Sequence, residues 1–123
     1  MISLILFAFG GFLNAVQDTL ADHWDGSIFA KCGWSKEFWH KGSSWQRKHW
    51  LPSWIPDAFT DGWHITKFLK LCAYGFAIVF YTPLWQIWIL PIWMTDFIIM
   101  GMARNWKFSI FYNWILWKKN ESN

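Results

Sequence analysis

Apolar residues gather into three long runs, which are separated by polar or proline-containing stretches. The runs cover residues 2–21, 58–81 and 84–103. Each is close to the ~20 residues that a helix needs to cross the ~30 Å hydrocarbon layer of a bilayer. The pattern predicts an all-α integral membrane protein, with about three transmembrane helices in one domain of residues 1–123.

Proline and aspartate mark the expected ends of the second and third runs. Asp57 can cap the second helix, and Pro83 ends it, because the residue before a proline avoids the helical region. Pro91 lies within the third run and is expected to kink it. An alternative topology continues one bent helix through Pro83 and crosses the membrane once fewer.

Two segments outside these runs mix aromatic and basic residues. The connection of residues 22–57 is rich in Trp, Lys, Ser and Gly, and residues 105–118 combine Trp, Phe and Ile with Lys. Rings that dip toward lipid and lysines that reach for phosphate are typical of the headgroup layer. We expect short helical or irregular pieces in the loop and a C-terminal helix lying along the interface.

Composition supports the membrane class over a soluble one. Hydrophobic residues make up 54% of the chain, and 13 residues are Trp, which collects at membrane–water interfaces. The alternative is a small soluble protein with a Trp-packed core. The first run could also be a cleaved signal peptide, but no basic residue precedes it and no small-x-small cleavage site follows it.

The distribution of charge predicts an orientation. With three crossings, all 11 basic residues fall on one side, which is the mark of a cytoplasmic face. We therefore expect a bacterial inner-membrane protein with its long loop and C-terminus in the cytoplasm, where Cys32 and Cys72 stay reduced. The net charge of +3 with interspersed acids favours anionic lipid headgroups as partners and not nucleic acid.

Two acidic stripes carry the candidate chemistry. Asn14, Asp18, Asp22 and Asp25 follow spacings of four, four and three, which place them on one helical face. His23 lies on the same segment, five residues after Asp18. Since the first helix leaves the membrane where the second enters it, this stripe should meet a second one at similar depth.

The second stripe consists of Asp57, Asp61 and His64, again on one helical face. Facing carboxylates repel, and a cation, shared protons, or the nearby Lys67 and Lys70 would relieve the repulsion. Carboxylate and imidazole ligands suit zinc, manganese or iron. The predicted divalent-metal site consists of Asp18, His23, Asp61 and His64, with Asp22, Asp57 and Lys67 in support.

A structural interpretation of the same residues stays open. Asp57 and Asp61 would then be helix caps, and His64 would hydrogen-bond in the interface. Asp96 falls deep in the third run, and its expected partners are Lys70, Lys67 or Arg104 in a buried ion pair. A role for Asp96 in proton relay is the alternative.

One part of the sequence resembles a family of small integral membrane proteins of bacteria and phages. The resemblance covers about residues 11–70 and is carried by Asn14-Ala15-Val16, Asp18-Thr19-Leu20, His23, Ser27-Ile28-Phe29, Phe38-Trp39, Ser44-Trp45 and Asp61-Gly62-Trp63-His64. It implies a membrane location and no reaction.

Three functions remain open at this stage. The first is a membrane enzyme or metal-binding protein that acts at the cytoplasmic interface on a lipid or headgroup-like substrate. The second is a structural or accessory subunit that packs with a partner protein or with its own copies. The third is a transporter or channel subunit, which would require oligomerisation.

Overall fold

The computed structural model describes residues 1–43, 52, 55–83 and 91–116, and of Asp57 the backbone alone. The described residues form helices and no strand, which confirms the all-α class. The elements are α1 (Ile2–Asp22), α2 (Ile28–Lys31), α3 (Lys36–Trp39), the 3₁₀ turn η1 (Asp57–Phe59), α5 (Gly62–Val79), α6 (Ile92–Ile110) and the π-helical η2 (Phe111–Leu116).

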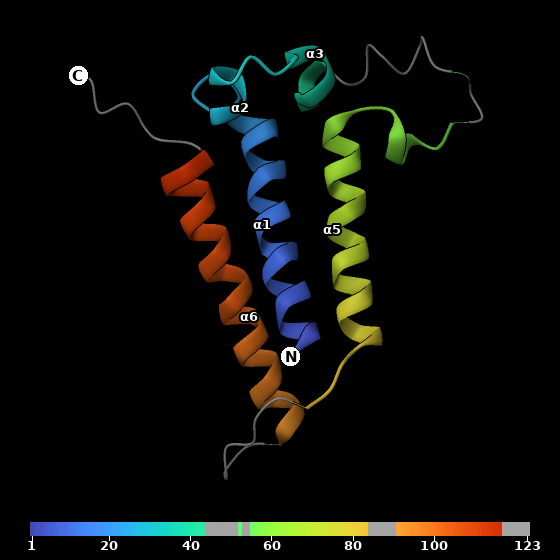
Figure 1. Ribbon diagram of the computed structural model, residues 1–123, viewed down its shortest axis with the longest axis vertical. Helices are drawn as coiled ribbons and strands as arrows, with labels where there is room; N and C mark the ends of the chain where they lie inside the picture. The colour runs from blue at the N-terminus through green and yellow to red at the C-terminus, as the bar shows by residue number, and fades with distance from the viewer. Residues whose placement is uncertain (44–51, 53–54, 84–90, 117–123) are drawn as a thin grey trace.

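Helix α1 lies between α5 and α6, as Figure 1 shows. Helices α1 and α6 run in the same direction and α5 runs in the opposite direction. One end of the bundle carries α2 and α3 and is called the α2–α3 end below. The other end carries Met1 and Tyr81 and is called the Tyr81 end.

The predicted first helix is confirmed over almost its whole length. Within the described ranges, α1 is the one helix long and apolar enough to cross a membrane, judged by length and composition. A cleaved signal sequence or the core helix of a soluble protein would have the same two properties. The second and third crossings therefore remain predictions.

The second helix begins later than predicted. It starts at Gly62 and not at residue 58, because the side chain of Asp61 accepts a hydrogen bond from the backbone N–H of His64 and caps the helix there. Asp57 instead begins the short turn η1, and its side chain lies outside the description. The helix ends at Val79, two residues before the predicted end at Tyr81.

The third helix differs more from the prediction. It begins at Ile92, with Pro91 as the residue before it, and not at Leu84, so Pro91 does not kink a helix interior. A proline is tolerated at a helix start because the first N–H groups have no intrahelical partner. Residues 84–90 lie outside the description.

The described part of residues 105–118 does not form the separate helix that was predicted. Residues 105–116 continue α6 and η2 along α1 and do not form a separate helix. The ring of Phe111 packs edge-on against Phe12 at 4.6 Å between centroids, and Leu116 is buried. Of the aromatic residues that suggested an interface, Phe111 packs on α1, whereas Trp106 and Trp114 are exposed.

The long loop contains the short helical pieces that were expected. Ser27 caps α2 by accepting from the N–H of Ala30 at 3.2 Å. Helix α3 packs back on the loop, where Trp34 lies 4.6 Å from Trp39 and 4.9 Å from Phe29 between ring centroids. The loop residues 44–51, 53 and 54 lie outside the description.

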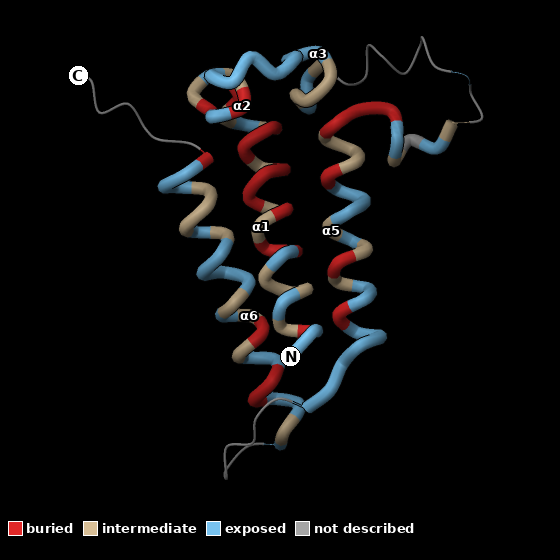
Figure 2. Tube along the Cα trace, in the orientation of Figure 1, coloured by how far each residue is buried: buried red, intermediate tan, exposed pale blue. Residues whose placement is uncertain are grey.

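The buried residues lie mainly on α1, with others along α5 and near the start of α6, while much of the surface of the long helices is exposed (Figure 2). The core at the α2–α3 end consists of Ala15, Val16, Leu20, Trp24, Phe29 and Leu116. Nearer the N-terminus of α1, two glycines let the neighbouring helices approach. A Cβ on Gly11 would lie 2.5 Å from the carbonyl oxygen of Arg104, and one on Gly10 would overlap the ring of Tyr74.

The close approach at Gly11 gives a stability prediction. Gly11→Ala should destabilise the protein by about 1–3 kcal/mol, because the methyl group meets the backbone of α6, which cannot rotate away. The measurement is thermal unfolding of the purified protein in detergent.

The matched control is Gly75→Ala, at a helical glycine with nothing within 4 Å of a new Cβ. That change should stabilise α5 by about 0.5–1 kcal/mol, since alanine loses less backbone entropy. Equal effects of the two substitutions would contradict the observed helix packing.

Candidate functional site

The fully buried carboxylate of Asp61 is surrounded by donors from its own segment. Its Oδ1 accepts from the N–H of His64 at 2.9 Å, and its Oδ2 accepts from the hydroxyl of Thr60 at 3.0 Å. The imidazole Nδ1 of His64 lies 2.6 Å from Oδ2. Asp61 and His64 therefore pair as their spacing predicted, and Asp61 is a helix cap, as the structural interpretation expected.

Asp18 lies half-buried on α1 in a second polar group. The amide Nδ2 of Asn14 donates to its Oδ2 at 3.1 Å. Lys70 of α5 reaches across the helix interface and donates to Asn14 Oδ1 at 2.9 Å and also to Gln17 Oε1. Asn14 and Asp18 come from the predicted stripe, whereas Gln17 was not predicted.

A third contact joins α6 to α5 one helical turn further along α5 from Lys70. The Nε of Arg104 donates to the hydroxyl of Tyr74 at 2.8 Å, with the guanidinium 5.7 Å from the Tyr74 ring centroid. The following side chains make up what is called the central polar cluster below: Asn14, Gln17, Asp18, Lys70, Tyr74 and Arg104. It links all three long helices through hydrogen bonds.

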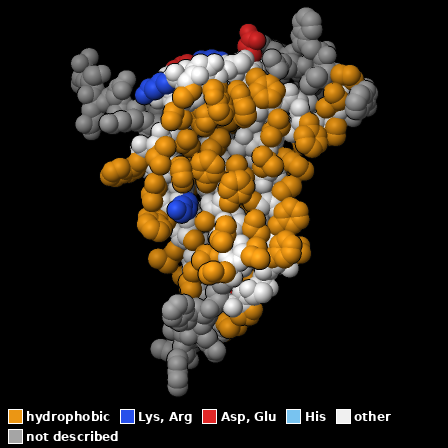
Figure 3. Space-filling view, viewed as in Figure 1, with side chains coloured by type: hydrophobic (Ala, Val, Ile, Leu, Met, Phe, Trp, Pro, Cys, Tyr) orange, Lys and Arg blue, Asp and Glu red, His pale blue; other side chains and the backbone are white. Residues whose placement is uncertain are grey.

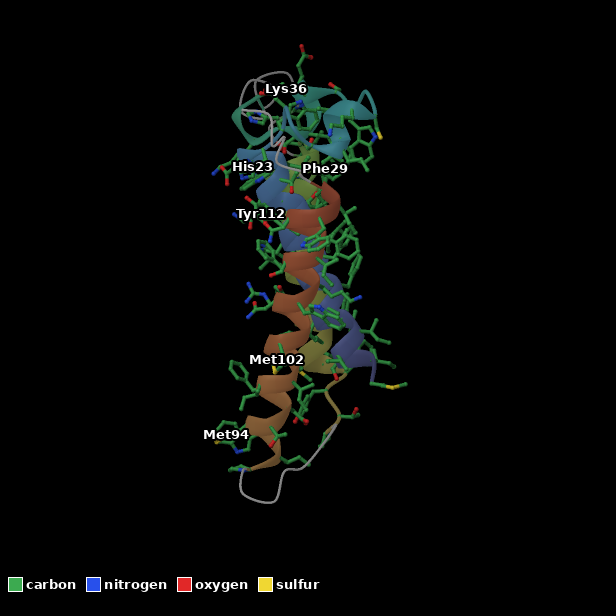
Figure 4. The ribbon with its side chains drawn as sticks, turned by 90° about the vertical axis from the view of Figure 1, so that its left-hand side faces the viewer. His23, Phe29, Lys36, Met94, Met102 and Tyr112 are labelled. Carbon is green, nitrogen blue, oxygen red and sulfur yellow. The ribbon has the colours of Figure 1, made fainter. Side chains whose placement is uncertain are left out.

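The remaining predicted metal ligands point elsewhere. His23 ends α1 and packs edge-on against Tyr112 at 5.5 Å between ring centroids, near the α2–α3 end (Figure 4). Asp22 is exposed. In the part of the chain that is described, no three His, Cys, Asp or Glu side chains converge to hold a metal ion. The four-ligand metal site stays a prediction, and the structure adds nothing to it beyond the Asp61–His64 pair.

Lys67 does not reach the acidic residues that it was expected to neutralise. Its ammonium lies 5.4 Å from the ring centroid of Trp63, and that of Lys41 lies 5.5 Å from the same ring. Such cation–π contacts are worth about 0.5–1 kcal/mol at exposed sites. They hold the loop close to the first turn of α5.

Asp25 forms an exposed ion pair with Lys36 at 2.8 Å. The hydrogen bond from Lys36, followed by its charge, lowers the pKa of the Asp25 carboxyl below its ordinary value. A lowered carboxyl pKa contributes stability above the ordinary pKa, and this is lost as pH falls through the lowered one. The contribution is small, because the Asp25 side chain is 87% exposed and screened by water.

Asp96 has a different partner from those predicted. It is buried at the Tyr81 end, where its Oδ2 accepts from the hydroxyl of Tyr81 at 2.6 Å. The hydrogen bonds of Lys70 and Arg104 go to the central polar cluster instead. Arg104 lies eight residues further along α6, which is ~12 Å at 1.5 Å per residue. Sequence reasoning missed both tyrosine partners, Tyr74 within α5 and Tyr81 just after the end of that helix at Val79.

The cap at Asp61 gives a second prediction. Asp61→Ala should destabilise the protein by about 2 kcal/mol, because α5 loses its cap and the buried donors around Asp61 lose their acceptor. Asp25→Ala, which removes an exposed carboxylate, should leave the unfolding midpoint nearly unchanged. Equal losses in thermal unfolding would argue against the cap.

The chain was also compared with known proteins. No family model, no curated protein and no solved structure matches it. The resemblance to small bacterial membrane proteins therefore stays a prediction.

Proposed function

We propose that this chain is a three-span integral membrane protein that acts as a non-catalytic subunit and assembles with a second copy of itself through the outer face of α6. The observation that carries the proposal is a ridge of exposed residues on α6, called the α6 ridge below. It consists of Ile98, Met102, Asn105 and Ser109, all exposed.

The exposed side chains support a membrane environment. Large apolar residues cover the outer faces of the long helices, including Ile5 (62% exposed), Ile78 (71%) and Phe97 (74%). Figure 3 shows apolar side chains over most of the visible helical face, with charged ones mainly at the α2–α3 end. Monomeric soluble proteins rarely expose apolar patches of this extent, whereas lipid tails would cover them.

The lengths of α5 and α6 are compatible with crossing. Helix α5 has 18 residues, and α6 with η2 continues from Ile92 to Leu116. At 1.5 Å per residue, α5 extends ~27 Å and α6 with η2 somewhat further. These lengths match the ~30 Å hydrocarbon layer, with the polar first turn of α5 in the interface.

The charge distribution supports the cytoplasmic assignment of the α2–α3 end. The loop helices there carry Lys31 and Lys36, while residues 71–103, which pass through the Tyr81 end, contain no Lys or Arg. Cytoplasmic segments attract basic residues. This orientation brings the basic loop to anionic headgroups.

The α6 ridge follows spacings of four, three and four, which is the pattern of helices that pack along a seam. Asn105 is adjacent to Arg104, whose backbone contacts Gly11, near the middle of α1. Asn105 would therefore face lipid at about the mid-depth of the bilayer, where an unpaired amide is costly. A partner helix would provide the missing hydrogen bonds.

A second copy fits the α6 ridge best. Two copies inserted with the same topology place their α6 helices parallel and at the same depth. The Asn105 amide is both donor and acceptor, so it is complementary to itself across a two-fold axis. The guanidinium of Arg104 turns toward Tyr74 on α5, which keeps like charges away from the seam.

The polar side chains support a structural role over a catalytic one. Asp61 accepts from Thr60 and His64, and Lys70 donates to Asn14 and Gln17. These hydrogen bonds fix both polar groups in place. An enzyme of the predicted kind would need Asp18, His23, Asp61 and His64 to converge.

Disulfide cross-linking tests the assembly. In a chain with both native cysteines changed to serine, Met102→Cys on the α6 ridge should form a cross-linked dimer in membranes. Phe76→Cys, an exposed position on the outer face of α5, should not. Adding Asn105→Leu should weaken the dimer by about 1 kcal/mol, roughly fivefold in its dissociation constant.

Two results would overturn the proposal. Equal cross-linking at positions 76 and 102 would show random collision and no α6 seam. More bound metal in the wild type than in the Asp61→Ala/His64→Ala double variant would restore the metal-site hypothesis. Metal analysis of both purified proteins gives the second result directly.

Labelling of Cys32 tests the orientation. This cysteine is exposed in the loop at the α2–α3 end, so a membrane-impermeant maleimide should label it in inside-out vesicles and not in right-side-out ones. The control is labelling of both preparations after detergent is added. Reaction only in right-side-out vesicles would reverse the assigned topology.

A further inference from the structure

The segment of α3 lies against the first turn of α5. Figure 1 shows α3 beside the start of α5, and the ring of Trp39 packs directly on Gly62. A Cβ on Gly62 would overlap this ring, so the contact requires a residue without a side chain. The contact holds Lys41, two residues after Trp39, next to the exposed side chains at the start of α5.

Two lysines lie against one indole ring at this junction. The ammonium nitrogen of Lys67 is 5.4 Å from the ring centroid of Trp63, and that of Lys41 is 5.5 Å from it. The two positive charges are therefore no further apart than about twice that distance. Both lysines are exposed. Since they come from separate segments of the chain, the fold and not the local sequence brings their charges together.

Lys67 is not neutralised by an acid of the chain. In the described ranges, no carboxylate lies within ion-pair distance of its ammonium group. The carboxylate of Asp61, six residues before it, is fully buried and accepts from the Thr60 hydroxyl and the backbone N–H of His64. An anion that approaches Lys67 from outside therefore meets an exposed positive charge, with a second one on Lys41 close by.

The indole N–H of Trp63 lacks an acceptor. Its Nε1 is buried and makes no hydrogen bond to any residue that the structure describes. The ring packs edge-on against the imidazole of His64, at 4.9 Å between centroids, which holds it in this orientation. A buried tryptophan N–H usually finds a partner. An oxygen held beside the ring by the lysines would supply one, because their long, flexible side chains can shift to admit it.

An apolar stripe leads from Lys67 along α5 toward the Tyr81 end. It consists of Leu71, Gly75 and Ile78, which continue from Lys67 with spacings of four, four and three and are all exposed. These three residues are called the α5 stripe below. A Cβ on Gly75 would meet nothing within 4 Å, so the stripe has an open step at its centre. An extended hydrocarbon chain can lie along it, with a charged group at Lys67.

We infer that Lys41, Lys67 and Trp63 bind the phosphate group of one anionic lipid, whose acyl chain lies along the α5 stripe. Phosphate oxygens accept hydrogen bonds from ammonium and indole N–H groups alike. The inference rests on the proposed membrane location, which puts the first turn of α5 in the headgroup layer, and not on self-assembly. It goes beyond a general attraction of basic residues for anionic lipids, because it assigns one lipid to a defined position.

Lipid titration of the purified full chain in an uncharged detergent tests the site. Phosphatidylglycerol should raise the thermal unfolding midpoint by about 3–5 °C at a few times its dissociation constant, because a ligand of the folded state stabilises it. Phosphatidylcholine, which has no net charge, and inorganic phosphate, which has no acyl chain, should give little shift. No shift with phosphatidylglycerol, or an equal shift with either control, would overturn the inference.

Charge variants separate the site from general electrostatic attraction. Lys41→Gln/Lys67→Gln should weaken phosphatidylglycerol binding roughly tenfold or more, at about fivefold for each lysine. The matched control, Lys31→Gln/Lys36→Gln, removes the same charge from exposed loop positions at the same end of the bundle. It should leave the affinity nearly unchanged, because exposed charges away from the lipid are screened by salt. Equal losses in the two double variants would overturn the inference.

The indole donor has a test of its own. Trp63→Phe keeps an aromatic ring beside the lysines and removes the N–H, so it should weaken phosphatidylglycerol binding about fivefold. Trp34→Phe makes the same change at an exposed tryptophan of the loop and should keep the affinity of the wild type. Equal binding by the wild type and Trp63→Phe would contradict the inferred hydrogen bond to the phosphate.

Failure of the lipid site and failure of the proposed function give different results. Asn105→Leu should lose the dimer and keep the response to phosphatidylglycerol. A chain that stays in the membrane fraction but responds equally to phosphatidylglycerol and phosphatidylcholine would contradict the lipid site alone. A chain recovered in the soluble fraction would contradict the membrane location and, with it, the lipid site.

Discussion

The structure depends on how closely α1 can approach its two neighbours. Gly10 and Gly11 present no side chain, so the ring of Tyr74 and the backbone of Arg104 come into contact with the α1 backbone. In the membrane that we propose as its setting, lipid tails are as apolar as the side chains between helices, so close packing and hydrogen bonds would hold the helices together more than the hydrophobic effect. At this separation Lys70 can reach Asn14 and Gln17. A wider separation would leave these groups in a low-dielectric interior without partners.

The long helices were predictable from the sequence because hydropathy and length report burial in apolar surroundings, whether protein or lipid. The helix ends were less predictable. Asp57 and Asp61 are both suitable caps, and the choice of Asp61 depends on the hydrogen bonds from Thr60 and His64. Residues 105–116 have the composition of an interfacial helix, yet Phe111 and Leu116 pack on α1. Composition alone does not distinguish a side chain buried against lipid headgroups from one buried against a neighbouring helix.

Polar contacts within one helix could be predicted, and contacts between helices could not. Asn14 with Asp18, and Asp61 with His64, follow from spacings of four and three along the chain. The partner of Lys70 depends on how α1 and α5 are rotated and shifted relative to each other, which no local pattern specifies. Lys70 was one of the expected partners of Asp96, because an ionisable residue inside a membrane is expected to pair with one of opposite charge. The amide oxygens of Asn14 and Gln17 proved to accept the hydrogen bonds of Lys70.

Helix α6 carries two ionisable groups of opposite charge, Asp96 and Arg104, which lie eight residues apart. Each is hydrogen-bonded to a tyrosine of the α5 segment. Tyr74 accepts a hydrogen bond from Arg104, and Tyr81 donates one to Asp96. A phenol hydroxyl is both donor and acceptor, so one residue type serves the cation at one level and the anion at the other. Tyr74 lies within α5 and Tyr81 follows the end of that helix at Val79, so an axial shift of α5 would disturb both bonds. The two bonds therefore join the α5 segment to α6 at two levels, one near the middle of α1 and one at the Tyr81 end.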